Sequence, residues 1–197
     1  MFRNFKWMDE SRSSVSDEEV MIYAPEKTDY FCHPGSAAQE GITPESLGNA
    51  PFFYTEITGD FVLRAQVEHG FADTYDSACI MVMQNERVWA KACSEMTDFG
   101  THAVVSVVTN QFSDDANGCN FEGNVAWLQL ARVDNTFAFH YSLDGERFDM
   151  MRFFSLPVDD TVKVGLLAQA PVGGGGERFF RHFSLEQKTV ANIRAGK

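Results

Sequence analysis

The sequence predicts an all-β protein, a two-sheet antiparallel jelly-roll sandwich. Strand-like runs recur at near-regular spacing with turn residues between them, and no stretch shows the periodicity of an amphipathic helix. The chain has 197 residues, 44% of them hydrophobic, which is enough to bury a large core. No internal repeat or low-complexity segment divides it. We therefore expect one sandwich domain over residues 1–186 and a polar tail over residues 187–197.

The N-terminal elements follow from composition and spacing. Residues 1–24 place apolar side chains on both sides of an acidic stretch, which favours two short edge strands over a helix. Residues 25–51 are rich in Pro, Gly, Ser and Asn and predict a long loop or lid. Residues 52–68 alternate like a half-buried strand after a turn at residues 58–60.

Residues 75–95 contain two strand-like runs joined by a polar turn at residues 84–86. Because successive side chains of a strand point to opposite faces, the second run has one face of small residues that can pack inward. Its other face is a candidate site, and it carries Arg87, Trp89, Lys91, Cys93 and Glu95.

The remaining sequence predicts further strands and two connecting segments. Residues 111–124 have the composition of a surface loop, and residues 173–176 are a glycine connector without the spacing of a phosphate-binding loop. The tail could hold one helical turn. The strands are expected over residues 103–109, 125–133, 136–143, 148–156, 162–168 and 178–185.

The charge balance restricts the classes of partner. The formal net charge is -12 and no cluster of Lys and Arg occurs, so neither nucleic acid nor an anionic membrane is an expected partner. Neutral or cationic small molecules remain compatible with such a surface. The N-terminus has no signal-peptide pattern and no stretch is apolar enough to span a membrane, so we expect a cytoplasmic protein.

The cysteines and the acidic turn do not predict a metal site. Cys32, Cys79, Cys93 and Cys119 lack CxxC spacing, which favours buried free thiols over zinc ligands or disulfides. The turn at residues 113–118 lacks the spacing of a calcium-binding loop and is expected to be solvated. We expect no metal and no other cofactor.

A series of ordered motifs points to a family. They are FKW at 5–7, KTDYF at 27–31, FFYTEITGDF at 52–61, YDSACIMV at 75–82, WAK at 89–91, VVSVVT at 104–109, FSD at 112–114, YSLDGE at 141–146 and MMR at 150–152. Together they resemble the family called domain of unknown function 1349, which is also labelled "regulation of enolase".

This resemblance covers residues 5–185 and implies a fold of the concanavalin A-like lectin/glucanase type, with a concave sheet that carries the sugar site in lectins and glucanases. It implies no activity, because one fold hosts many functions. The chain has Phe31 where the family tends to have Trp, and it lacks the usual aromatic near Asp115, which is compatible with a different ligand.

The first functional hypothesis is the binding of a carbohydrate or another small polar ligand on the concave sheet. Trp89 would supply an aromatic platform and planar polar groups would make paired hydrogen bonds. The expected contacts are Asp76, Arg87, Trp89, Lys91, Glu95, Gln129, Arg152 and Gln169. The alternative is that this row is a solvated face with salt bridges among Lys91, Glu95 and Asp76.

Two further classes are kept open. A glycoside hydrolase or lyase would use Glu95 with Asp76, but the Glu-x-Asp-x-Glu pattern is absent, and Lys91 is expected to lower the pKa values of both carboxyls. No G-x-S-x-G occurs, which argues against a serine hydrolase, and we assign no catalytic residue. The third class is a protein-interaction or regulatory module of carbon metabolism, in which edge strands could pair into a homodimer.

Overall fold

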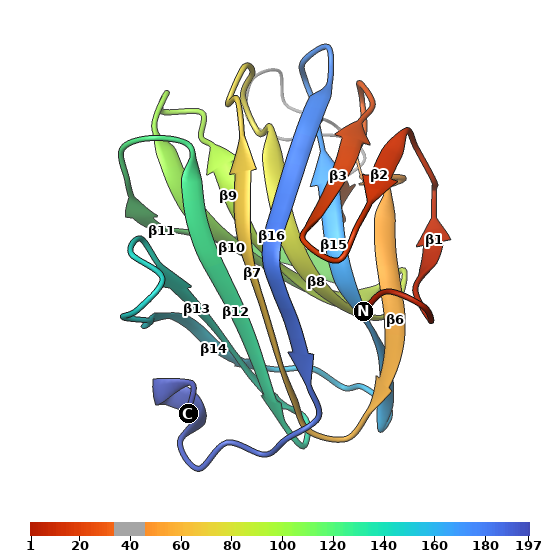
Figure 1. Ribbon diagram of the computed structural model, residues 1–197, viewed down its shortest axis with the longest axis vertical. Coiled ribbons are helices and arrows are strands. Elements are labelled where there is room, and N and C mark those ends of the chain that lie inside the picture. The colour runs from red at the N-terminus through yellow and green to blue at the C-terminus, as the bar shows by residue number, and fades with distance from the viewer. Residues whose placement is uncertain (34–45) are drawn as a thin grey trace.

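The computed structural model describes residues 1–33 and 46–197, which form two seven-stranded antiparallel sheets packed face to face (Figure 1). The first sheet runs β1 (Lys6–Met8), β6 (Phe52–Thr58), β15 (Thr161–Gln169), β8 (Ser77–Asn85), β9 (Val88–Met96), β10 (His102–Asn110) and β11 (Phe112–Asn120). The second runs β14 (Asp149–Ser155), β13 (Thr136–Ser142), β12 (Val125–Val133), β7 (Phe61–His69), β16 (Gly176–Glu186), β3 (Glu19–Ala24) and β2 (Ser13–Val15). The predicted all-β sandwich is confirmed.

The chain crosses repeatedly between the two sheets, as in a jelly roll. It passes from β6 to β7, returns to β8, and crosses again from β11 to β12 and from β14 to β15. The hairpins β8–β9 and β12–β13 each stay within one sheet and close through the tight turns that the sequence predicts. This connectivity places residues distant in sequence next to each other on neighbouring strands.

One predicted loop is a strand. Residues 112–120 form β11, which pairs with β10 from Asn110 opposite Phe112 to Ala103 opposite Asn120. The strand lies at the edge of the first sheet and most of its side chains are exposed, so it needs no apolar alternation. The segment is a strand because its backbone pairs with β10, and amino-acid composition does not reveal such pairing.

The main core lies between the sheets and is built from inward-facing residues of both. Phe61, Leu63, Phe137 and Phe139 from the second sheet are fully buried against the small residues of β8 and β9. The predicted inward face of β9 is confirmed, since Val88, Ala90 and Ala92 belong to this core.

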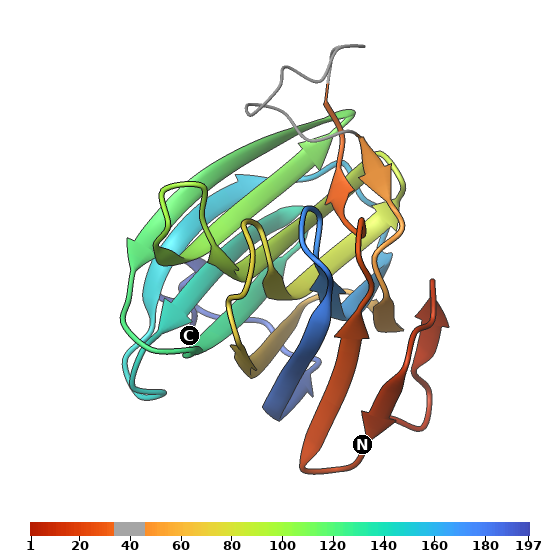
Figure 2. The same cartoon turned by 90° about the horizontal axis from the view of Figure 1, so that it is seen from above.

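A second apolar cluster lies on the outer face of the first sheet. The short pair β4 (Tyr30–Phe31) and β5 (Leu47–Gly48) lies against this face (Figure 2). Tyr30 packs there with Trp89, Met81 and Phe52. The described flanks of the predicted 25–51 loop therefore cover part of β9, and residues 34–45 of that loop lie outside the described residues.

Polar side chains also join the two sheets. The Nε2 of His69 on β7 lies 2.9 Å from the Ser94 carbonyl oxygen, and its Nδ1 accepts from the Phe71 amide at 3.2 Å, so Nε2 carries the proton. Burial lowers the pKa of His69 to about 3, which keeps the ring neutral. Arg178 on β16 donates to the carbonyls of Ser77 and Gln169.

The C-terminal residues return to the outer face of the second sheet. The 3-10 turn Ile193–Ala195 lies against β12 and β13, where Gln129 donates to the Gly196 carbonyl at 3.2 Å and the His140 Nε2 lies 3.1 Å from the Arg194 carbonyl. No helix within residues 1–33 and 46–197 has the length and apolarity needed to cross a membrane.

Gly165 on β15 is expected to be essential for close strand approach. A Cβ at this position would overlap the carbonyl oxygen of Phe53 on the neighbouring strand. We expect Gly165→Ala to lower the free energy of unfolding by about 1–3 kcal/mol, measured by urea denaturation. Gly174→Ala, whose Cβ would meet nothing within 4 Å, is the control and should change stability by less than about 0.5 kcal/mol. Equal effects of the two substitutions would contradict this account.

Candidate functional site

A polar cavity of about 270 Å³ opens on the outer face of the first sheet, beside the β4–β5 pair. Strand register brings its walls together, because residues directly opposite on antiparallel strands share a face. Val107 on β10 lies opposite both Lys91 on β9 and Asp115 on β11. The lining residues are Asp29, Phe31, Tyr75, Lys91, Glu95, Asp98, Val105, Val107, Asp115, Asn117 and Gln169.

Lys91 forms the buried base of this cavity. Its ammonium donates to Asp29 Oδ1 at 3.0 Å, to the Tyr30 carbonyl at 2.9 Å and to Gln169 Oε1 at 2.7 Å. An ammonium has three N–H donors, so all of them are occupied by protein acceptors. Burial pulls the pKa of Lys91 down, but Asp29 and the acidic groups around it outweigh burial and hold the pKa above its usual value.

Asp29 connects this ammonium to the covering segment. Its Oδ1 also accepts from the Tyr30 amide at 2.7 Å, and its backbone exchanges hydrogen bonds with Asn49 just after β5. The ion pair with Lys91 is almost fully buried on both sides. It therefore fixes the described flanks of the 25–51 segment on the sheet.

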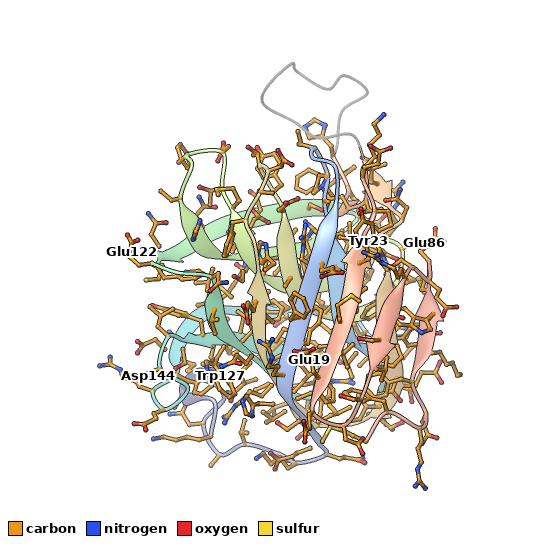
Figure 3. The ribbon with its side chains drawn as sticks, turned by 45° about the horizontal axis from the view of Figure 1, so that its top comes forward. Glu19, Tyr23, Glu86, Glu122, Trp127 and Asp144 are labelled. Atoms are coloured by element: carbon orange, nitrogen blue, oxygen red, sulfur yellow. The ribbon has the colours of Figure 1, made fainter. Side chains whose placement is uncertain are left out.

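Glu95 lies four residues further along β9 than Lys91, on the same face, and differs in its surroundings. The side chain is only 8% exposed, yet within residues 1–33 and 46–197 its carboxyl has no hydrogen bond or ion pair. Carboxyls such as Glu122 and Asp144 lie instead at the periphery of the molecule (Figure 3). Glu95 is thus a buried acid that faces a cavity without a protein partner.

The electrostatics of Glu95 differ from the expectation. Burial raises its pKa well above the usual range, whereas Lys91 lowers it by a smaller amount. The predicted net lowering is wrong because the effect of burial is larger than the attraction of Lys91, and Asp29 raises the pKa further. The carboxyl therefore keeps its proton at pH values where an exposed glutamate is ionised.

Tyr75 forms one wall of the cavity and has a strained backbone. Its φ is 66°, an uncommon value for a bulky residue, and its amide donates to the Met96 carbonyl at 2.7 Å. Burial, followed by the charges of Asp98 and Glu95, raises the pKa of Tyr75. Strained residues of this kind cluster at functional sites.

The structure corrects the expected role of Trp89. Its side chain is 0% exposed and lies under Tyr30, with the ring centroids 5.8 Å apart in an edge-to-face arrangement. Its Nε1 donates to the Glu86 carbonyl at 3.3 Å. Trp89 is therefore part of the outer apolar cluster and offers no platform to a ligand.

Asp76 and Glu95 do not share a site. Ser77, and not Asp76, lies opposite Glu95, so the side chain at position 76 points to the other face of the sheet. There Asp76 pairs with Arg178 at 3.1 Å, and both side chains are buried. The expected contacts of Asp76 with Lys91 and Glu95 are thus absent from the described structure.

Three other predicted contacts also lie outside the cavity. Arg87 is exposed in the turn before β9 and donates to the Gln111 carbonyl at 3.4 Å. Gln129 lies on the second sheet and accepts from the Arg64 guanidinium. Arg152 pairs with Asp114 at 2.8 Å. Lys91, Glu95 and Gln169 are the predicted residues that the cavity brings together.

Sequence reasoning missed much of the lining. The sequence places Asp29 and Phe31 of the KTDYF motif in a loop, and it places Asp115 and Asn117 in a surface loop that the structure shows as β11. A strand assignment for residues 112–120 would have placed positions 115 and 117 on one face. Within the described part of the chain no group of His, Cys, Asp and Glu is arranged to hold a metal ion. Cys32, Cys79, Cys93 and Cys119 are free thiols.

Comparison with known proteins places the chain in a family. Residues 7–188 match the family described as "Protein of unknown function (DUF1349)". The chain belongs to this family. The protein named "Regulation of enolase protein 1" from Saccharomyces cerevisiae is 26% identical over 182 residues, which are 91% of this chain and 87% of that protein. A functionally unknown protein from Saccharomyces cerevisiae has a similar solved structure, with a TM-score of 0.85, 24% identity and coverage of 96% of this chain and 99% of that chain.

More distant structures share the fold alone. A bifunctional GH43-CE protein of Bacteroides eggerthii matches 95% of this chain with a TM-score of 0.69 and 15% identity, although the match spans 24% of that protein. The exoplasmic/lumenal domain of VIP36, solved with Ca²⁺ and Man3GlcNAc, matches 98% of this chain and 87% of that domain with a TM-score of 0.55 and 8% identity. This DUF1349 domain is therefore a sandwich of the kind found in lectins and in glycoside hydrolases.

Removing the Lys91 ammonium is expected to destabilise the protein strongly. Lys91→Met leaves Asp29 buried without its counter-ion, which should cost about 3–5 kcal/mol in urea denaturation. Adding Asp29→Asn to this variant removes the orphaned charge and should recover part of the loss. Lys188→Met breaks an exposed pair with Glu186 and should cost at most about 1 kcal/mol. A double variant no more stable than Lys91→Met would argue against the ion pair.

Glu95 is expected to make stability fall as pH rises. A carboxyl with a higher pKa in the folded state contributes fully below the unfolded pKa of about 4.3, and this contribution is lost as pH rises through the folded value. Glu95→Gln removes this titration. Its thermal stability relative to the parent protein should therefore increase between about pH 5 and pH 8. The exposed Glu18→Gln is the control, and parallel pH profiles of Glu95→Gln and the parent would refute the assignment.

Proposed function

We propose that this domain binds a carbohydrate or another small polar ligand in the cavity around Glu95. The observation that carries the proposal is the buried Glu95 carboxyl, which faces an open cavity without a partner in the described residues. The Glu95 oxygens are not among the fully enclosed side-chain atoms, so they open onto the cavity, where a ligand hydroxyl can take the place of solvent. A protonated carboxyl both donates and accepts, as a hydroxyl group does.

The rest of the lining supports a polyhydroxylated ligand. The Oε1 of Gln169 is held by Lys91, while its amide nitrogen has no hydrogen bond within the described residues. Asn117 adds a second amide at the rim. Val105 and the ring of Tyr75 add apolar surface against which the C–H face of a sugar can pack.

The size of the cavity favours a small ligand. Its volume of about 270 Å³ is close to the lower limit of about 300 Å³ for ligand pockets in proteins. One sugar unit or a compound of similar size is therefore the appropriate class. A longer chain would have to continue outside the cavity, whose rim includes the exposed Asp98.

The geometry supports binding over hydrolysis. The carboxyl pair proposed from the sequence is divided between two faces of the sheet, because Asp76 pairs with Arg178 on the inner side. Lys91 cannot act on a substrate, since its three donors are occupied by Asp29, Tyr30 and Gln169. We therefore assign no catalytic residue.

A regulatory role in carbon metabolism is the second proposal, and the name of the yeast relative supports it. In this scheme the ligand-bound domain would act through a protein partner. Affinity isolation with the parent chain and with Glu95→Ala checks it, because a ligand-dependent partner should be recovered only with the parent. Equal recovery of the partner with both chains would show that the interaction does not depend on the cavity, and it would contradict this second proposal.

The binding proposal is tested by calorimetry and thermal shift with a panel of monosaccharides and polyols. We expect at least one of them to bind the parent protein, and Glu95→Ala to bind it at least tenfold more weakly, or about 1.4 kcal/mol. Glu18→Ala, an exposed position on the turn before β3, should bind like the parent. If no compound shifts the melting temperature, or if Glu95→Ala binds as the parent does, the proposal fails.

A further inference from the structure

We infer that the ligand of this cavity carries a positive charge next to its hydroxyl groups, and that an amine-bearing sugar is the class that the cavity selects. This inference rests on the binding function proposed above and names the chemistry of its ligand.

The balance of charge in the cavity supports a cation. Four carboxyls line it, those of Asp29, Glu95, Asp98 and Asp115, against the single ammonium of Lys91. Lys91 is paired with Asp29 at 3.0 Å. The other three carboxyls have no ion pair within residues 1–33 and 46–197, although Asp114, the neighbour of Asp115, pairs with Arg152. Because burial keeps Glu95 protonated in the free protein, the unbalanced acidic side chains are those of Asp98 and Asp115, and no basic side chain of the described residues pairs with them.

The acidic lining of the cavity includes a buried carboxyl, that of Glu95, as well as exposed ones. Asp98 and Asp115 are exposed at the rim, but Glu95 is 8% exposed and faces the cavity with an unpartnered carboxyl. The nearby ammonium cannot satisfy it, because Lys91 has no free N–H. A ligand ammonium has three donors and a full charge, and it can meet the buried carboxyl and a rim carboxylate together.

Aromatic side chains complete the site for an ammonium group. Tyr75 and Phe31 both line the cavity, and the negative face of an aromatic ring attracts a cation within about 6 Å. The strained backbone of Tyr75 holds this ring next to Asp98 and Glu95. An amine-bearing sugar combines the ammonium that these groups attract with the hydroxyl groups that Asn117 and Gln169 can bind.

Binding of such a ligand is coupled to a proton. In the free protein burial keeps the Glu95 carboxyl protonated, and a ligand ammonium stabilises the carboxylate. The exchange is balanced: –COOH and R–NH₃⁺ form the pair –COO⁻ and R–NH₃⁺, and one proton passes to the solvent. The other titratable groups that face Glu95 are Asp29, Tyr75, Cys79, Lys91, Cys93, Asp98 and Asp115.

The test is isothermal titration calorimetry at about pH 6, where a sugar amine is protonated. Hexosamines of gluco, galacto and manno configuration are compared with their parent hexoses, each in two buffers of different ionisation enthalpy. We expect a hexosamine to bind at least tenfold more tightly than its parent hexose and to release up to one proton per ligand. The parent hexose should release none.

Variants separate charge from hydrogen bonding. Glu95→Gln keeps a donor and an acceptor but cannot ionise, so it should lose both the hexosamine preference and the proton release. Asp98→Asn and Asp115→Asn should each reduce that preference severalfold. Glu18→Gln makes the same chemical change far from the cavity and should alter neither quantity.

The outcomes distinguish this inference from the function on which it rests. Hexoses that bind as tightly as hexosamines, or a hexosamine preference that survives Glu95→Gln, would overturn the inference and leave the binding function standing. If neither group of sugars binds, both are overturned. Tighter hexosamine binding with proton release only in chains that retain Glu95 supports the inference.

Discussion

The buried ammonium of Lys91 is the interaction on which the candidate site depends. It joins β9 to Gln169 at the end of β15, to Tyr30 in the covering strand β4 and to Asp29 just before that strand. These residues lie about sixty to eighty positions from Lys91 in the sequence. A buried charge of this kind is tolerated only with full pairing, and its three acceptors provide it. The covering segment is thereby fixed on the sheet, so the wall of the cavity and the burial of Trp89 follow from the same contact.

The outer face of β9 divides into two chemically different halves. At Trp89 the face is closed by Tyr30 and Met81 and is as apolar as the core between the sheets. At Glu95 the cover ends and polar side chains from β11 and the turn at Tyr75 surround an open space. Burial alone therefore does not predict function here. What matters is whether a buried polar group has a partner, as Lys91 has and Glu95 has not.

The sequence predicts the fold and the facing of β9, because side-chain alternation is a local property that one strand reveals by itself. It could not predict what covers that face, since the cover comes from Asp29 and Tyr30, far away in the chain. Asp76 shows how sensitive a site is to register: a shift of one residue sends its side chain to the other face and to Arg178. Gln129 lies on a strand that the sequence predicts, but that strand belongs to the second sheet, away from the cavity. Which sheet a strand joins depends on pairing with strands far away in the chain, and one strand does not reveal it.

The contrast between Lys91 and Glu95 limits the chemistry that this face can perform. A lysine with no free donor builds the site but cannot donate to a ligand, whereas the Glu95 carboxyl has no partner in the described residues and opens onto the cavity. Glutamine in place of Glu95 would fill the same volume without the cost of burying an ionisable group. What the carboxyl adds over the amide is a negative charge, available when a cation is present to stabilise it. In the proposed binding mode, a ligand cation offsets the cost of ionising the buried Glu95 carboxyl.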